Sequence, residues 1–429
     1  MTMRHRVSGS PIAQFSLRRN FYWTLAGNVV YAGCQWGMLV ALAKLCRAEQ
    51  VGLFALGLAT TAPILMLTNL QLRAVQATDA RSEHAFAEYL ALRLSGAALA
   101  LLAALAVALA VGTDRTSAGV IIAVAVAKCV ESISDIIYGL FQSREKLVLM
   151  ATSMLIKGPL SLAALSCLVW ASRGVLIGTL GLAAAWLLVL FLYDLPMAAK
   201  VLGGRKFLRP AFRSDSSLRL VRTALPLGVV MMLGSLTTNV PRYFVEKDLG
   251  ARDLGFFAAL SAVTAAGVTV VGALGQSATP RLARLFADGD RRGFVGLVLR
   301  LAGIGSLLGL AGIAVAAIGG ELLLRLLYTP DYSLHVRAFL VINLAAGIGY
   351  VASFLGYAIT AARQFLPQSP LSVAVVAATA LAAAWLVPLF GITGAAWAVG
   401  CGMTVQLLGE IWICRHAVTS MADLQAVNP

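Results

Sequence analysis

Charged and hydrogen-bonding side chains recur at helical spacing within stretches of this sequence that are otherwise almost wholly apolar. The clearest stripe holds Lys128, Glu131, Asp135 and Tyr138, whose steps of three, four and three residues place them on one face of a helix. Cationic donors suit phosphate or carboxylate ligands, and carboxylates could carry a coupling proton or sodium ion. The lysine and the two acids could equally neutralise one another as a structural cluster, and both interpretations stay open.

A second stripe lies in NLQLRAVQATDA, residues 69–80, at the end of a long apolar run. On a continuous helix, Asn69, Arg73 and Gln76 share one face. An arginine that reaches toward the interface would explain Arg73 alone. It would not require the two amides aligned with it, so the stripe indicates a binding face.

A charge at the centre of a bilayer costs roughly 2.5–3.5 kcal/mol, so such groups usually face a cavity or a partner. Lys157 lies deep in its apolar run without an acidic neighbour within two turns. Arg242 could instead extend to the outer surface, and Asn28 and Gln35 could form interhelical hydrogen bonds worth roughly 0.6 kcal/mol each. These alternatives also stay open.

The candidates are mostly cations or neutral donors, which favours an anionic and glycosylated substrate over a cationic one. The candidate substrate-binding residues are Arg73, Lys157, Arg93, Lys128, Arg242, Asn69, Gln76, Asn28, Gln35 and Tyr31. If transport is coupled to an ion, the acids to test are Glu131, Asp135, Asp194 and Glu410.

The elements that hold these residues are apolar runs of about 20 residues, the length that a helix needs to cross a bilayer. The chain has 429 residues, of which 59% are hydrophobic and 12% charged, against roughly 25% charged in soluble proteins. We therefore predict an all-α integral membrane protein of about twelve spans. The spans are 21–43, 51–72, 86–112, 118–141, 149–171, 175–198, 223–245, 254–279, 293–319, 336–361, 368–389 and 391–414.

The distribution of basic residues sets the predicted orientation. With the N-terminus inside, 21 Lys and Arg residues fall in inner segments and 7 in outer loops, which places both termini in the cytoplasm. The net charge of +15 then needs no nucleic-acid partner. The predicted parts are a cytoplasmic tail 1–20, an N-lobe 21–198, a basic linker 199–222 that also suits anionic lipid, a C-lobe 223–416 and a tail 417–429.

The two halves contain a short internal repeat, KLCRAEQVGLFAL at 44–56 and KDLGARDLGFFAA at 247–259. An even number of spans per half gives the halves one orientation, so we expect a parallel repeat of two six-helix lobes around a central cavity, the layout of an alternating-access transporter. At the offset of 203, the second-half counterparts of the stripe at 69–76 are polar or small but uncharged. The matched pairs are Lys44 and Lys247, Gly52 and Gly255, Phe54 and Phe257, and Ala55 and Ala258; the stripe counterparts are Gly272, Gln276 and Thr279.

Three stretches together resemble the polysaccharide-exporting branch of the multidrug/oligosaccharidyl-lipid/polysaccharide flippase superfamily. They are FYWTLAGNVVYAGCQWGMLVALAK at 21–44, VGLFALGLATTAPILMLTNLQLRAVQATDA at 51–80 and LVPLFGITGAAWAVGCGMTVQLL at 386–408. The resemblance implies a flippase that moves a polyprenyl-pyrophosphate-linked oligosaccharide, of the O-antigen or exopolysaccharide kind, across the bacterial inner membrane. It also implies a cationic cavity. We expect no cofactor, the candidate partners are polysaccharide polymerase or other assembly proteins, and the sequence leaves open whether the chain acts as a monomer.

Three other functions remain as alternatives, and one of them is an assembly scaffold without transport. A drug or cation antiporter of the same superfamily would need a functional acid and would tolerate the loss of Arg73 or Lys157. A membrane-bound polysaccharide polymerase or glycosyltransferase would need a sizeable outer loop with catalytic residues, whereas the longest outer segment here, 320–335, is mostly apolar. The six cysteines form no CxxC pair or metal-ligand cluster, so neither disulfides nor a metal site is expected.

Overall fold

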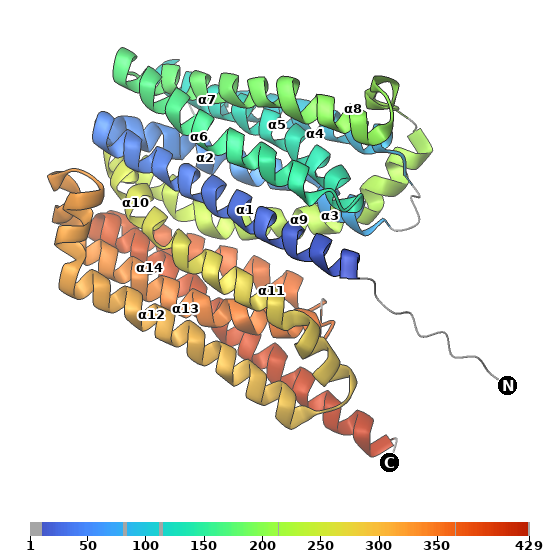
Figure 1. Ribbon diagram of the computed structural model, residues 1–429. Coiled ribbons are helices and arrows are strands. Elements are labelled where there is room, and N and C mark those ends of the chain that lie inside the picture. The colour runs from blue at the N-terminus through green and yellow to red at the C-terminus, as the bar shows by residue number, and fades with distance from the viewer. Residues whose placement is uncertain (1–10, 80–83, 111–114, 213, 365, 428–429) are drawn as a thin grey trace. The chain divides into compact units, whose positions relative to one another are not determined.

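The computed structural model describes residues 11–79, 84–110, 115–212, 214–364 and 366–427, and these residues form helices joined by short turns, without strands (Figure 1). The predicted all-α membrane fold class is confirmed. The helices of the first half are α1 (Pro11–Leu45), α2 (Ala48–Asn69), α3 (Leu72–Thr78), α4 (Phe86–Ala110), α5 (Arg115–Ser143), α6 (Leu147–Ser172), α7 (Val175–Val189), the π-helical turn η1 (Leu190–Asp194), α8 (Leu195–Leu202) and the 3-10 turn η2 (Arg205–Leu208). Those of the second half are α9 (Ser214–Leu249), α10 (Ala251–Val263), α11 (Ala265–Ala287), α12 (Arg291–Leu327), the 3-10 turn η3 (Pro330–His335), α13 (Val336–Ala361) and α14 (Gln368–Val427).

Ten helices within the described ranges are long and apolar enough to cross a membrane. They do not include α5, which carries the charged stripe, and they count α14 once although it is long enough for two crossings. Gly391 interrupts α14 with a φ of 59° and a ψ of −138°. This kink lies where the sequence predicts the turn between the last two spans, so the helices and the twelve predicted spans agree in their arrangement along the chain.

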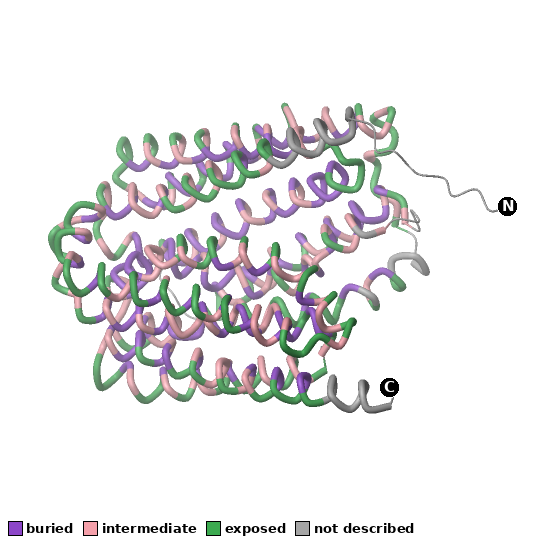
Figure 2. The backbone as a smooth tube through the Cα atoms, turned by 60° about the horizontal axis from the view of Figure 1, so that its bottom comes forward, coloured by how far each residue is buried: buried purple, intermediate pink, exposed green. Residues whose placement is uncertain are grey.

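Large apolar side chains are exposed along one face of several helices. On α4, Leu99, Leu102 and Leu109 are 59%, 64% and 73% exposed, and on α12 the exposed positions follow the same helical spacing. Arg93 and Lys157 are instead fully buried. Buried and exposed positions alternate along the helices in Figure 2. This arrangement, with leucines outside and charged groups inside, is the reverse of that in a soluble protein. It indicates that the helices are surrounded by lipid.

The chain divides into two compact units. Unit 1 comprises Met1–Met38 and Ile64–Gly228, and unit 2 comprises Leu39–Pro63 and Val229–Pro429. In unit 1, α5 packs against α4 and α7, and α6 packs against α7; in unit 2, α13 packs against α11, α12 and α14 (Figure 1). Residues 39–63 belong to the compact unit 2, although they lie in the first half of the chain.

A reciprocal glycine contact explains why this segment groups with unit 2. A Cβ added at Gly52 would overlap the carbonyl group of Ala251, and one added at Gly255 would overlap that of Ala48. Ala48 and Ala251 are themselves separated by 203 residues, the offset of the internal repeat. The two copies of the repeat therefore pack on each other symmetrically, with backbones too close for any side chain at the two glycines.

Further contacts from α2 join the same segment to unit 2. The Tyr243 hydroxyl donates to the Ala59 carbonyl at 2.6 Å, across 184 residues of chain. Arg252 Nε lies 3.9 Å from Glu49 Oε1 at the exposed end of the contact. The tyrosine bond and the glycine contact thus hold α2 against α9 and α10.

The predicted continuous face of Asn69, Arg73 and Gln76 is wrong. α2 ends at Asn69, Leu70 and Gln71 both have a φ of 52°, and α3 begins at Leu72. Two successive left-handed residues cost of order 1–3 kcal/mol each. Burial of the Leu70 and Leu72 side chains, which are 7% and 0% exposed, offsets this cost. The break therefore changes the direction of Arg73 and Gln76 relative to Asn69.

The reciprocal glycine contact makes a test of the fold possible. In a helix interior, replacing glycine by alanine normally stabilises by roughly 1 kcal/mol. At Gly52 or Gly255 we expect alanine to lower the free energy of unfolding by roughly 1–3 kcal/mol or more. The new methyl group would collide with backbone atoms, which cannot move aside as a flexible side chain can. Thermal unfolding of the purified full-length protein in detergent measures this loss.

Gly303→Ala on α12 is the matched control, because a Cβ there meets no atom within 4 Å. Equal unfolding temperatures for Gly52→Ala, Gly255→Ala and Gly303→Ala would show that the reciprocal contact is absent.

Candidate functional site

Unit 1 contains a layer of charged side chains among apolar helices, three of them buried and four of them 26–35% exposed. Its four cations come from α3, α4, α5 and α6, and its three carboxylates come from α5 and η1. The cations are Arg73, Arg93, Lys128 and Lys157, and the carboxylates are Glu131, Asp135 and Asp194. All seven are residues that the sequence singles out. Four positive charges against three negative ones leave an excess of one cation in this cluster.

Lys157 and Asp194 form the most buried pair of the layer. Their side chains are 1% and 0% exposed, and Lys157 Nζ lies 3.2 Å from Asp194 Oδ2. The same carboxylate accepts hydrogen bonds from Ser134 Oγ at 2.7 Å and Ser153 Oγ at 2.5 Å. Lys157 Nζ also lies 5.2 Å from the centre of the Tyr138 ring. Lys157, which has no acidic neighbour along its own helix, therefore pairs with an acid from another element. Neither member of the pair is exposed to a ligand.

A π-helical turn positions Asp194. Residues Leu190–Asp194 form η1 between α7 and α8, and the three elements continue as one span, Val175–Leu202. A π turn is rare and is often found at functional sites. Here it brings the carboxylate to α5 and α6, from which its three donors come. The serines are a feature that sequence reasoning missed, although Ser153 lies one helical turn before Lys157 and shares its face.

Two guanidinium groups share one carboxylate elsewhere in the layer. Arg73 Nη1 lies 3.1 Å from Asp135 Oδ1, and Arg93 Nη2 lies 3.3 Å from Asp135 Oδ2. Arg93 is fully buried, and within the described part of the chain its Nε and Nη1 have no hydrogen-bond partner. The Arg73 side chain is 33% exposed and also lies near Gln142 and Met150. The excess positive charge is therefore at this trio, at a point that a ligand can reach.

Lys128, Glu131 and Tyr31 form a third group. Lys128 Nζ lies 2.7 Å from Glu131 Oε2 and 5.2 Å from the centre of the Trp186 ring. The Tyr31 hydroxyl donates to Glu131 Oε1 and so joins α1 to α5. The stripe on α5 is thus not one self-neutralising cluster, because Lys128 pairs with Glu131 while Asp135 pairs with the two arginines.

The amide candidates of unit 1 do not converge on the trio of Arg73, Arg93 and Asp135, which is called the arginine trio below. Asn28 is exposed and donates to the Thr24 carbonyl of its own helix at 2.8 Å. Gln35 is half-buried on α1, and Asn69 lies beyond the break between α2 and α3. Gln76 is buried against Gly139 of α5, where a Cβ would overlap its side-chain oxygen. Gln76 therefore packs α3 against α5 beside the site.

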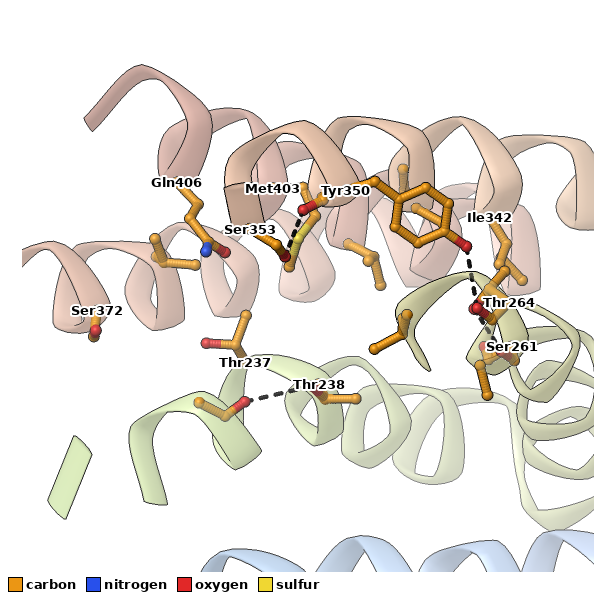
Figure 3. Close-up of a pocket in the computed structure, with 18 of the residues that line it drawn as sticks. Thr237, Thr238, Ser261, Thr264, Ile342, Tyr350, Ser353, Ser372, Met403 and Gln406 are labelled. Atoms are coloured by element: carbon orange, nitrogen blue, oxygen red, sulfur yellow. Dashed lines mark hydrogen bonds between the residues drawn. The ribbon is translucent and has the colours of Figure 1, made fainter. Parts of the chain in front are cut away.

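Unit 2 contains a different kind of site, a cavity of about 740 Å³ bounded by α9, α10, α11, α13 and α14 (Figure 3). Of the sequence candidates, Arg242 and Glu410 line it. Arg242 therefore faces a cavity, and its Nη1 donates to Asn239 Oδ1 at 3.0 Å. Glu410 Oε1 accepts from Gln406 Nε2 at 3.1 Å. The remaining lining is made mostly of hydroxyl, amide and apolar side chains.

The buried pair of unit 1 makes a clear prediction about stability. Lys157→Met leaves Asp194 as a buried charge without its cation, so we expect it to lower the free energy of unfolding by roughly 3–5 kcal/mol. The double variant Lys157→Met with Asp194→Asn removes both charges and should recover most of that loss. Thermal unfolding of the purified full-length variants measures both effects. A Lys157→Met protein as stable as the wild type would contradict the pairing.

Comparison with known proteins places this geometry in a family and a fold. A capsular polysaccharide biosynthesis protein of Staphylococcus aureus, CapF, is 25% identical over 401 residues, which is 93% of this chain and 99% of the relative. The lipid II flippase MurJ in an inward closed conformation is similar in structure, with a TM-score of 0.65, 12% identity, and coverage of 98% of this chain and 93% of that one. A mutant of the MATE transporter VcmN of Vibrio cholerae has a TM-score of 0.58, 15% identity, and coverage of 94% and 97%. At these identities the structural likeness concerns the fold, which is that of multi-pass membrane transporters.

The family profile described as "Polysaccharide biosynthesis protein" matches residues 17–286, and this range includes every charged residue of the layer in unit 1. Since the match covers well over half of the sequence, the chain belongs to the polysaccharide biosynthesis protein family.

Proposed function

We propose that the chain is a flippase and not an enzyme. In this proposal it moves a polyprenyl-pyrophosphate-linked oligosaccharide, such as an O-antigen or exopolysaccharide repeat unit, across the bacterial inner membrane by alternating access. Both termini are cytoplasmic, as the distribution of basic residues predicts. Polysaccharide polymerase or other assembly proteins are its candidate partners.

The observation that carries the proposal is the trio of Arg73, Arg93 and Asp135. Two guanidinium groups with one carboxylate lack one negative charge, and a cation in apolar surroundings attracts an anion strongly. Arg93 still has two unpartnered donor nitrogens among the described residues, and Arg73 is a third exposed. Guanidinium groups bind phosphate through pairs of N–H donors. A pyrophosphate that enters beside Arg73 would supply the missing negative charge.

The physical demands of the reaction agree with such a site. A pyrophosphate and several sugar hydroxyls cannot cross roughly 30 Å of hydrocarbon without replacement of their water. The polyprenyl tail is as apolar as the bilayer and can stay in lipid throughout. The protein therefore needs to bind only the head group, and buried cations with polar neighbours do this without a soluble domain.

The relatives support the same reading. CapF is described as a capsular polysaccharide biosynthesis protein, and MurJ as a lipid II flippase. Together they connect the family to polysaccharide synthesis and the fold to transport of a lipid-linked precursor. Alternating access agrees with the internal repeat, because two copies of one unit can exchange inward and outward states.

A cation antiporter is the second candidate, and one observation favours it. Glu410 is 7% exposed and its Oε2 has no hydrogen-bond partner among the described residues. The other acids that the sequence offers for ion coupling, Glu131, Asp135 and Asp194, are each paired with a cation. A buried carboxylate with only an amide partner could bind a cationic substrate or a coupling proton.

Arg73→Gln tests the proposal without leaving an unpaired carboxylate, because Asp135 keeps Arg93. We expect the variant to reach the membrane at wild-type level and to lower surface polysaccharide roughly tenfold or more, the effect of losing a charge-assisted contact of about 1.5–3 kcal/mol. The measurement is surface polysaccharide in cells that rely on the variant, with membrane protein quantified by immunoblot.

Arg300→Gln is the matched control, since Arg300 is an exposed arginine on the membrane-spanning helix α12. Normal polysaccharide in cells with Arg73→Gln would refute the arginine site. If Glu410→Gln alone abolished transport while Arg73→Gln had no effect, the antiporter would be the better account.

A further inference from the structure

The cavity of unit 2 differs chemically from the charged layer of unit 1. Its volume of about 740 Å³ lies within the roughly 300–1,000 Å³ typical of small-molecule sites. Its lining contains eight hydroxyl groups and two glutamine amides but only two ionisable side chains that carry a guanidinium or carboxyl group, Arg242 and Glu410. Figure 3 shows Gln406 from α14 reaching toward α9, where Thr237 and Thr238 lie, while Tyr350 and Ser353 come from α13. Such a lining suits a polar, largely uncharged ligand.

The hydrogen atoms of these hydroxyl groups are already in use. Ser261 donates to the Phe257 carbonyl and Ser353 to the Gly349 carbonyl, both at 2.8 Å. Thr237 and Thr238 also donate to carbonyls one turn earlier in their helix, and the Tyr350 hydroxyl donates to the Thr264 carbonyl at 3.1 Å. A hydroxyl that donates its hydrogen keeps two lone pairs as acceptors. The lining therefore presents mostly acceptor oxygens to the cavity.

Gln406 and Glu410 add to this acceptor surface. Gln406 uses an amide hydrogen on Glu410 Oε1, so its own carbonyl oxygen stays available. Glu410 is 7% exposed, and its Oε2 has no partner within the described part of the chain. A buried carboxylate oxygen without a donor is costly. A ligand that brings O–H donors would remove that cost.

A surface of acceptors distinguishes between the two ends of a lipid-linked sugar. Phosphate oxygens are acceptors and would face acceptors here, which is repulsive. Sugar hydroxyls are donors, and the apolar atoms of Met403, Ile342 and Tyr350 suit the C–H faces of a sugar ring. Arg242, whose Nε also lacks a partner among the described residues, supplies a donor for a hydroxyl or carboxylate oxygen of the same sugar.

We infer that the cavity of unit 2 is a glycan-binding site, which takes the hydroxyl-rich oligosaccharide of the substrate. This inference rests on the proposed function and adds a second site to it. According to this inference, the residues of α9, α10, α13 and α14 that carry hydroxyl and amide oxygens determine which sugar unit is transported.

Binding to two lipids tests this inference. The full-length protein in nanodiscs is titrated with undecaprenyl pyrophosphate and, separately, with undecaprenyl-pyrophosphate-linked oligosaccharide extracted from the cells that make the protein. We expect the variant Thr238→Val with Ser261→Ala and Ser353→Ala to bind the glycan-bearing lipid at least about tenfold more weakly, the effect of three lost hydrogen bonds. Its affinity for the lipid without sugar should be unchanged.

Thr404→Val is the matched control. Thr404 is, like Thr238, an exposed threonine that donates to a carbonyl one turn earlier, but it lines a separate and mostly apolar cavity of unit 2. Because valine has the shape of threonine, this substitution should alter neither affinity.

The outcomes separate the two levels of the account. Equal affinity of the triple variant and the wild type for the glycan-bearing lipid would overturn the glycan site, even if Arg73→Gln weakens both lipids and so upholds the proposed function. Failure of the wild type to bind either lipid would overturn the proposed function itself. Weaker binding of both lipids by the triple variant would show that the cavity does not distinguish sugar from phosphate, and would also overturn the inference.

Discussion

The structure of unit 1 depends on the requirement that its ionised groups, which lie among apolar helices, find counter-charges. In unit 1 this requirement brings α3, α4, α5, α6 and η1 together, because each contributes a charge that the others neutralise. The Lys157–Asp194 pair satisfies the requirement completely, with two serines that complete the carboxylate's hydrogen bonds. The trio of Arg73, Arg93 and Asp135 does not satisfy the requirement, because it lacks one negative charge. That difference separates a group that holds the helices together from a group that can bind a ligand.

The glycine contact of unit 2 has a comparable role for the backbone. Gly52 and Gly255 allow two copies of one sequence repeat to pack within the distance that a side chain would need. In lipid, where apolar helices gain nothing by leaving the solvent, close packing of small residues is a main source of association between helices. The contact therefore gives the repeat a physical meaning: it holds α2 to α10, and it requires glycine in both copies.

Local patterns in the sequence predict much of this structure. The length of the apolar runs indicates the spans, and the stripe on α5 follows from residue spacing. The partner of Lys157 could not be predicted, because Asp194 lies 37 residues away and reaches it through a π turn that no spacing rule anticipates. The break at Leu70 and Gln71 was also unpredictable, since neither residue favours a left-handed backbone and burial of their neighbourhood decides the conformation. The cavity of unit 2 was missed because its hydroxyl groups are individually unremarkable in a helix and converge only when five helices pack.

Reconstitution tests the central claim most directly. The full-length protein is placed in liposomes with a fluorescent polyprenyl-pyrophosphate-linked oligosaccharide in both leaflets, and a membrane-impermeant quencher reports how fast the inner-leaflet lipid reaches the outside. The account predicts that in wild-type liposomes the inner-leaflet half of the fluorescence becomes quenched, and that with the Arg73→Gln protein this half becomes quenched roughly tenfold more slowly or not at all. Protection of that inner pool in wild-type liposomes, together with uptake of a cationic dye by the same liposomes, would contradict it.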